Sequence, residues 1–100
     1  MNVISKRGLD KLAESQKVDL DVNAELNIWF HVARRAHWTR LAEVQDDYPS
    51  VDQVGKVLVF NIRHNRYRLI ATVSFAAQQL YVKALLTHKE YDRKEWRKWA

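Results

Sequence analysis

The spacing of apolar residues changes once along this chain of 100 residues, and that change limits its fold more than any other feature. Before residue 52, apolar side chains recur every three to four residues, which is typical of amphipathic helices. After residue 55, the chain has short runs rich in β-branched and aromatic residues, which is typical of strands. The connections between these later strands are short and allow only hairpins. We therefore expect an α+β fold in which N-terminal helices pack on one face of an antiparallel β-sheet.

The first half predicts a short strand at residues 2–5 and three helices. The second helix, at about residues 22–35, has an apolar stripe formed by Val22, Leu26, Trp29, Phe30 and Ala33. A short third helix ends at Tyr48, because a proline disfavours helical backbone in the residue before it. The expected caps and the stop signal are Ser5 for the first helix, Asp19 or Asp21 for the second, and Pro49 after the third.

The second half predicts three strands at residues 56–62, 67–75 and 80–86. The turn at 63–66 contains Asn65, which tolerates left-handed backbone and suits a hairpin. Strict alternation places Arg68, Lys83 and Asn61 on the face away from the helices. In the last strand it groups Leu80, Val82, Ala84 and Leu86 on one face.

We expect a single domain over residues 1–100, with a helical part at about 5–48 and a sheet part at about 56–86. The basic, aromatic tail at about 93–100 forms either a last helical turn or a disordered end. The chain has no Cys, which excludes disulfides and thiolate metal sites. It has no apolar secretory signal and no apolar run near the ~18 residues that span a membrane. These features predict a cytoplasmic protein that does not enter the membrane.

Positive charge is concentrated in the second half. Residues 1–50 carry 7 Lys and Arg against 8 Asp and Glu, whereas residues 51–100 carry 10 against 4. No acidic residue occurs between Gln53 and Lys89. This asymmetry favours a polyanionic partner, either a nucleic acid or an acidic protein, over an ordinary solvated surface.

The segment Thr87–Asp92, THKEYD, carries the side chains best suited to proton transfer. A metal site is not expected, because the four His residues lack metal-ligand spacing and the sheet region has no carboxylate. No cofactor-binding motif is present either. Metal-independent cleavage of RNA remains: a base deprotonates the ribose 2′-OH, cations stabilise the phosphorane, and an acid protonates the leaving 5′-oxygen. His88 is the natural titrating group. The residues alone equally allow a capped loop in which His88 and Asp92 hydrogen-bond to each other.

Two motifs resemble the HigB toxins of type II toxin–antitoxin systems, within the RelE-like group. They are Phe60-Asn61-Ile62 followed by Asn65-x-Tyr67-Arg68-Leu69-Ile70, and Thr87-His88-x-Glu90-Tyr91-Asp92. The segments VISKRGL and YPSVD and the Trp-bearing second helix are similar as well, so the resemblance covers essentially the whole chain. One departure is His64, which stands where relatives commonly have Gly.

The resemblance implies a small α+β endoribonuclease that cuts translated mRNA on the ribosome, without a cofactor. It also implies a cognate HigA-type antitoxin, a helix-turn-helix protein. The implied catalytic residues are His88 as acid or base, Arg68 and Lys83 at the scissile phosphate, and Tyr91 as a positioning or protonating group. The expected RNA-binding residues are Arg63, His64, Arg66 and Lys89. The expected structural residues are Asn61, Asn65, Glu90 and Asp92.

Two other functions remain open from the sequence. The basic sheet face can serve a non-catalytic module that holds RNA or the ribosome, or that docks an acidic antitoxin segment. A DNA-binding protein is less consistent with the chain, because the positive charge lies on strands and tail and no helix-turn-helix pattern is present.

Overall fold

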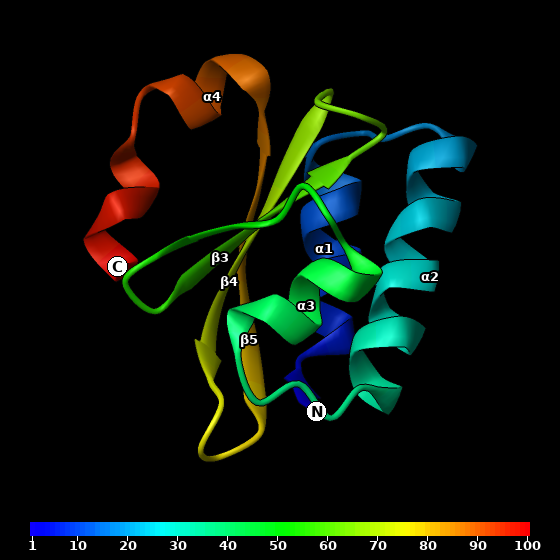
Figure 1. The fold of residues 1–100 in the computed structure, drawn as a ribbon. Helices are drawn as coiled ribbons and strands as arrows, with labels where there is room; N and C mark the ends of the chain where they lie inside the picture. The colour runs from blue at the N-terminus through cyan, green and yellow to red at the C-terminus, as the bar shows by residue number, and fades with distance from the viewer.

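Five strands form one mixed sheet in the computed structural model, which describes residues 1–100. The order across the sheet is β1-β5-β4-β3-β2. The strands are β1 (Asn2–Ile4), β2 (Asp52–Val54), β3 (Val57–Ile62), β4 (Tyr67–Ser74) and β5 (Gln79–Thr87). Figure 1 shows the sheet between the helices α1 and α2 on one side and the C-terminal segment on the other. The expected α+β class, with helices packed on the sheet, is confirmed.

Two edge strands differ from the sequence expectation. β3, β4 and β5 pair antiparallel through hairpins, as predicted. β2 was not foreseen, and it pairs antiparallel with β3. β1 was predicted as a strand, and it pairs with β5 in parallel. Parallel pairing is possible here because the whole helical part of the chain separates the two strands and serves as the crossover. The antiparallel description therefore holds for four of the five strands.

Three helices lie on one face of the sheet, and none is long and apolar enough to span a membrane. They are α1 (Lys6–Ser15), α2 (Leu20–Arg35) and α3 (Leu41–Asp47). Both predicted caps are confirmed: Ser5 Oγ accepts from the Gly8 amide at 2.9 Å, and Asp19 Oδ1 accepts from the Val22 amide at 2.9 Å. The core on this side is centred on Phe60, whose ring lies 5.3 Å from the rings of both Trp29 and Tyr48.

The strict alternation expected in the last strand is wrong after Val82. Ile70 pairs with Ala84 and Ala71 pairs with Val82, so Lys83 is an extra residue in β5 and forms a β-bulge. The bulge reverses the faces that follow it. Val82 packs on the helical side, whereas Ala84 and Leu86 pack on the opposite side.

The turn between β3 and β4 also differs from its prediction. Arg63 and His64 adopt the left-handed conformation, with φ of 51° and 64°, and Asn65 does not. The Arg63 amide donates to Glu25 Oε2 on α2 at 2.7 Å. This contact ties the turn to the helical layer, and it accounts for left-handed backbone at residues that disfavour it.

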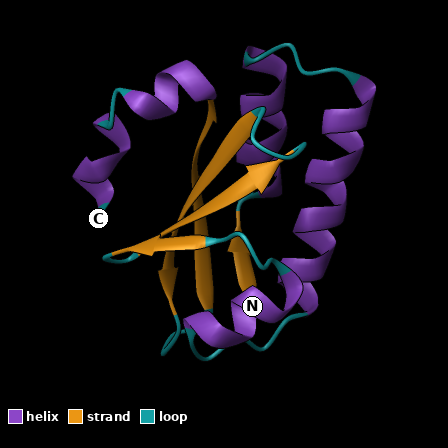
Figure 2. Cartoon of the chain, turned by 45° about the horizontal axis from the view of Figure 1, so that its top comes forward, coloured by secondary structure: helices purple, strands orange, loops and turns teal.

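The C-terminal segment covers the second face of the sheet, which was expected to be open. Its elements are α4 (His88–Asp92) and a 3₁₀ helix at Glu95–Trp99. Trp96, only 4% exposed, packs in a second apolar cluster with Val57, Val59, Ile70 and Ala84. The tail is therefore the helical turn that the sequence allowed, and the sheet is covered on both faces (Figure 2).

The turn between β2 and β3 closes against the end of this segment. Gly55 has a φ of +57°, and a Cβ atom there would lie 2.9 Å from the carbonyl carbon of Ala100. Only glycine fits this approach without a shift of the backbone.

Replacing Trp96 by Ala tests the docking of the tail. We expect the free energy of unfolding to fall by about 3–5 kcal/mol, because a buried indole is lost and leaves a cavity. Urea denaturation followed by circular dichroism measures the change. Arg97→Ala, at an exposed neighbour, should stay within about 0.5 kcal/mol of the parent chain. If the free energy of unfolding changed as little in Trp96→Ala, the docking of the tail on the sheet would not stabilise the fold.

Candidate functional site

The predicted site residues gather mainly at the end of the sheet where β4 begins and β5 ends. Tyr67 pairs with Thr87, which brings the turn at 63–66 and the start of α4 to the same edge. Arg68 pairs with Asn61 on one side and with Leu86 on the other. Since paired residues point to the same face, Arg68 and Asn61 lie on the face covered by the C-terminal segment.

Arg68 is held by two contacts. Its Nη1 donates to the backbone carbonyl of Asn65 at 2.7 Å, and its Cζ lies 5.1 Å from the centroid of the Tyr91 ring. The Tyr91 ring stacks on Trp96 with centroids 5.2 Å apart and an interplanar angle of 5°. A guanidinium held in this way keeps other N–H donors available for an anion.

His88 is the first residue of α4. Its Nε2 lies 3.4 Å from Asp92 Oδ2, one helical turn later, and the two side chains are 59% and 62% exposed. The sequence allowed a structural alternative to catalysis in which His88 and Asp92 contact each other, and the structure has this contact. The imidazole is nevertheless exposed to solvent. An exposed imidazole can exchange protons with a ligand.

Glu90 has a structural position in this segment. Its Oε1 accepts from the Thr87 amide at 2.9 Å, Thr87 Oγ1 accepts from the Glu90 amide, and together they form a capping box. Gln16 Nε2, at the end of α1, donates to the same Oε1 at 2.7 Å. The hydrogen bond from the Thr87 amide, followed by the one from Gln16, lowers the pKa of Glu90. These bonds fix where α4 leaves the sheet.

The two arginines of the turn pair with acids at the start of α2. Arg66 Nη1 lies 2.8 Å from Asp19 Oδ2, and Arg63 Nη2 lies 3.9 Å from Asp21 Oδ2. The pKa of Asp19 is lowered, first by its hydrogen bond from the Val22 amide and then by Arg66. Both ion pairs are exposed, so a polyanion can compete for the guanidinium groups at little cost. His64 lies between them in the exposed turn.

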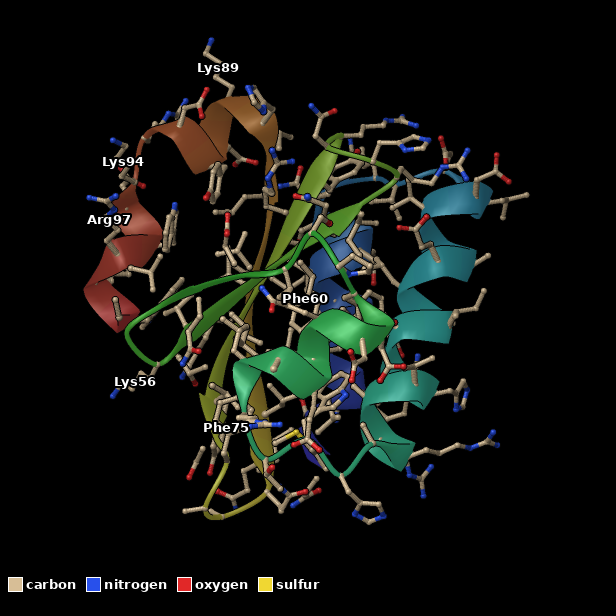
Figure 3. All side chains as sticks on the ribbon, viewed as in Figure 1. Lys56, Phe60, Phe75, Lys89, Lys94 and Arg97 are labelled. Carbon is tan, nitrogen blue, oxygen red and sulfur yellow. The ribbon has the colours of Figure 1, made fainter.

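The two predicted lysines lie on different elements, Lys83 on β5 and Lys89 on α4 beside His88. Lys83 is three strand residues before Leu86, the pairing partner of Arg68, which is roughly 10 Å along β5. Lys89 points outward from the C-terminal segment, as do Lys94 and Arg97 (Figure 3).

Sequence reasoning missed two residues that support this site. Trp96 stacks behind Tyr91, and Gln16 holds Glu90 from a different layer of the fold. The abundance of Trp in the tail was a usable signal for the first, because a solvated tail rarely carries two indoles. Nothing local to Gln16 indicated the second.

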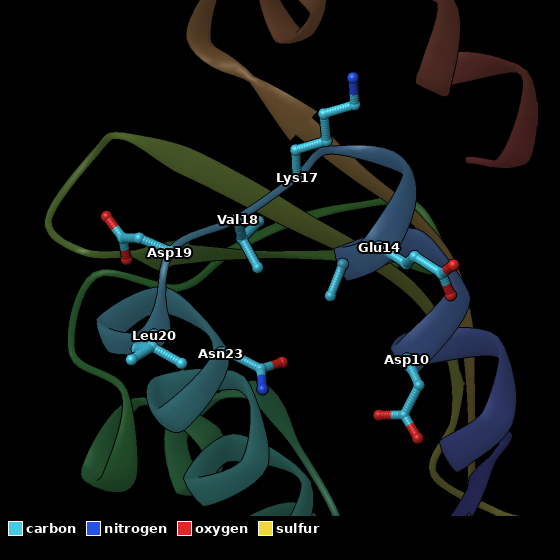
Figure 4. Close-up of a pocket in the computed structure, with 8 residues that line it drawn as sticks. Asp10, Glu14, Lys17, Val18, Asp19, Leu20 and Asn23 are labelled. Carbon is cyan, nitrogen blue, oxygen red and sulfur yellow. The ribbon is translucent and has the colours of Figure 1, made fainter.

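The largest surface hollow lies in the helical layer, between α1 and α2 (Figure 4), and its lining residue Asp19 pairs with Arg66 of the turn. Its volume is about 590 Å³, and the polar groups around it include the carboxylates of Asp10, Glu14 and Asp19. None of the residues predicted for catalysis or RNA binding lines it. No three His, Asp or Glu side chains in the structure are close enough together to hold a metal ion. We therefore place the candidate site at the sheet edge around Arg68.

The contribution of the Glu90 charge to stability can be tested by measuring unfolding at several pH values. In Glu90→Gln the capping contact remains but its charge is lost, so we expect wild type to be more stable by about 1 kcal/mol at pH 7. The folded pKa of Glu90 is lowered, so this advantage is complete above the unfolded value near 4.5 and is lost as pH falls through the folded value. Urea denaturation at pH 7, 5 and 3 measures it, with Glu14→Gln as control. An advantage that is equal at all three pH values would contradict the assignment.

Comparison with known proteins agrees with this architecture. Residues 22–94 match the HigB_toxin family model, described as the RelE-like toxic component of a toxin–antitoxin system. The mRNA interferase toxin HigB of Escherichia coli K12 is 28% identical over 95 residues, which cover 92% of this chain and 88% of the relative. The mRNA interferase HigB of Shigella flexneri gives the same values, and that of Escherichia coli O6:H1 is 25% identical over 96 residues, covering 93% and 90%. The resemblance seen in the sequence is confirmed: this chain belongs to the HigB_toxin family of RelE-like toxins from toxin–antitoxin systems.

Proposed function

We propose that this toxin is an endoribonuclease that cleaves translated mRNA on the ribosome and so inhibits translation. The observation that carries the proposal is Arg68, held by the Asn65 carbonyl and the Tyr91 ring at the sheet edge where His88 begins α4. A held guanidinium binds a phosphodiester, and an exposed imidazole moves protons. The names of the relatives, mRNA interferases, support the same activity.

The proposed reaction uses only groups of this chain. Arg68 binds the non-bridging oxygens of the scissile phosphate and stabilises the charge that grows on them. The ribose 2′-oxygen loses its proton to a base and attacks phosphorus, and the bond to the 5′-oxygen breaks as that oxygen receives a proton. His88 supplies one of these proton transfers, and Asp92 orients its ring. Tyr91 positions the phosphate or protonates the leaving oxygen.

The remaining predicted residues either bind the RNA or support the structure of the site. Arg63, His64, Arg66 and Lys89 surround the sheet edge and would contact the RNA backbone or ribosomal RNA. Asn61 lies across from Arg68, and Asn65, Glu90 and Asp92 fix the surrounding backbone and His88. Lys83 lies roughly 10 Å along β5 from the residue that pairs with Arg68, and we assign it to a neighbouring phosphate of the RNA.

The chain, as the toxic component of such a system, has an antitoxin partner. We propose that this partner is a HigA-type helix-turn-helix protein, and that the toxin acts in the cytoplasm where mRNA is translated. A non-catalytic module would use the same basic surface to bind RNA, the ribosome or an acidic antitoxin segment, and the experiment below separates the two functions.

Cleavage of mRNA on programmed ribosomes tests the proposal. We expect cuts by the wild type, a loss of about 10²–10⁴-fold in His88→Ala, and a loss of about 10²–10³-fold in Arg68→Ala. His37→Ala and Arg35→Ala, on the helical layer, are matched controls and should cut like the wild type. Circular dichroism checks that each variant folds.

Unchanged cleavage in folded His88→Ala and Arg68→Ala would contradict the assigned chemistry. Ribosome binding by a wild type that makes no cuts would favour the non-catalytic module. A ribosome-free reaction with a metal chelator tests separately whether cleavage needs a metal ion. The chelator cannot be added to the ribosomal assay, because the ribosome itself needs magnesium.

A further inference from the structure

A second hollow lies on the face of the sheet that carries Arg68, beside the bulge in β5. Its volume is about 340 Å³. The bulge, the turn between β2 and β3, and the end of the C-terminal segment enclose it; Figure 3 places Lys56 at this end of the molecule, beside the chain terminus. The lining residues are Lys56, Thr72, Val73, Ser74, Tyr81, Lys83, Lys98, Trp99 and Ala100.

Three lysines surround this hollow, and no acidic side chain lines it. None of the three ammonium groups lies within 4.0 Å of a carboxylate, including that of Ala100. Lys83 reaches the hollow because the bulge adds one residue to β5. Three lysines line this concave surface against the single carboxylate of Ala100, so the hollow keeps a positive charge that favours an anion.

Aromatic rings accompany two of these cations. Lys98 Nζ lies 4.9 Å from the centroid of the Trp99 ring, and Lys83 Nζ lies 5.6 Å from that of Tyr81. Trp99 is half-buried and Tyr81 is 37% exposed, so both rings present surface to a ligand. Ser74 Oγ accepts from the Ala77 amide at 3.2 Å, which leaves its hydroxyl hydrogen free to donate. Cations interleaved with aromatic rings are how proteins hold single-stranded RNA, whereas an acidic peptide needs only the cations.

We propose that this hollow binds a nucleotide next to the scissile one, with its phosphate on Lys56, Lys83 and Lys98 and its base against Trp99 or Tyr81. The site is roughly 10 Å along β5 from the residue that pairs with Arg68, on the same face of the sheet. Trp96 covers Ile70 between the two positions, so an RNA strand bound at Arg68 reaches the hollow by passing over the C-terminal segment. The inference rests on the proposed function, because it takes the same RNA as substrate.

Binding of a non-cleavable RNA tests the inference without the ribosome. The probe is a fluorescein-labelled hexanucleotide with 2′-O-methyl groups throughout, followed by fluorescence polarisation between 0.05 and 0.3 M salt. Each phosphate contact is worth about five-fold in affinity at 0.1 M salt, so the double variant Lys56→Ala/Lys98→Ala should bind about 25-fold more weakly, with a salt slope shallower by about 1.4. Lys11→Ala/Arg35→Ala removes the same charge from the helical layer and should bind like the wild type.

A third variant separates RNA from an acidic protein segment. Trp99→Leu should weaken RNA binding about ten-fold through lost stacking and leave binding of a labelled polyglutamate peptide unchanged. Equal RNA affinity of the wild type and Lys56→Ala/Lys98→Ala would overturn the inference, as would loss of polyglutamate binding alone in that variant. Neither result depends on cleavage, so failure of the His88→Ala assay remains a separate outcome that bears on the proposed function.

Discussion

The strands β3 and β4 are buried over most of their length on both faces, and the rest of the structure depends on covering both. β3 is buried at five of its six positions, so its side chains must pack against a layer on each side. The helices α1 to α3 supply one layer around Phe60. The C-terminal segment supplies the other through Trp96, which removes a large apolar surface from water.

This second layer also builds the candidate site. Trp96 holds the Tyr91 ring by stacking, and Tyr91 in turn contacts the guanidinium of Arg68. Glu90 fixes the start of α4 through the capping box and through Gln16, so the position of His88 depends on α1 as well. Packing and candidate chemistry therefore use the same few residues, and the site is tied to rigid elements on both sides.

The cations of the second half of the chain differ in their acidic partners. The acids at the start of α2 neutralise Arg63 and Arg66 in the turn, whereas Lys56, Lys83 and Lys98 have no acidic partner. The absence of Asp and Glu between residues 53 and 89 is visible in the sequence, but the division of the cations into paired and unpaired groups is a property of the fold. Lys56, Lys83 and Lys98 line the hollow that we propose as a nucleotide site.

Local patterns in the sequence determined the α+β class, the helices with their caps at Ser5 and Asp19, the three hairpin strands and the motif around His88. These features depend on residues within a few positions of each other, and periodicity and capping chemistry report such contacts directly. The tertiary structure decided the parallel pairing of β1, the bulge at Lys83, the left-handed residues of the turn and the docking of Trp96. Each of these depends on a partner far away in the chain, such as Glu25 for Arg63 or Ile70 for Trp96, and no local spacing encodes that partner.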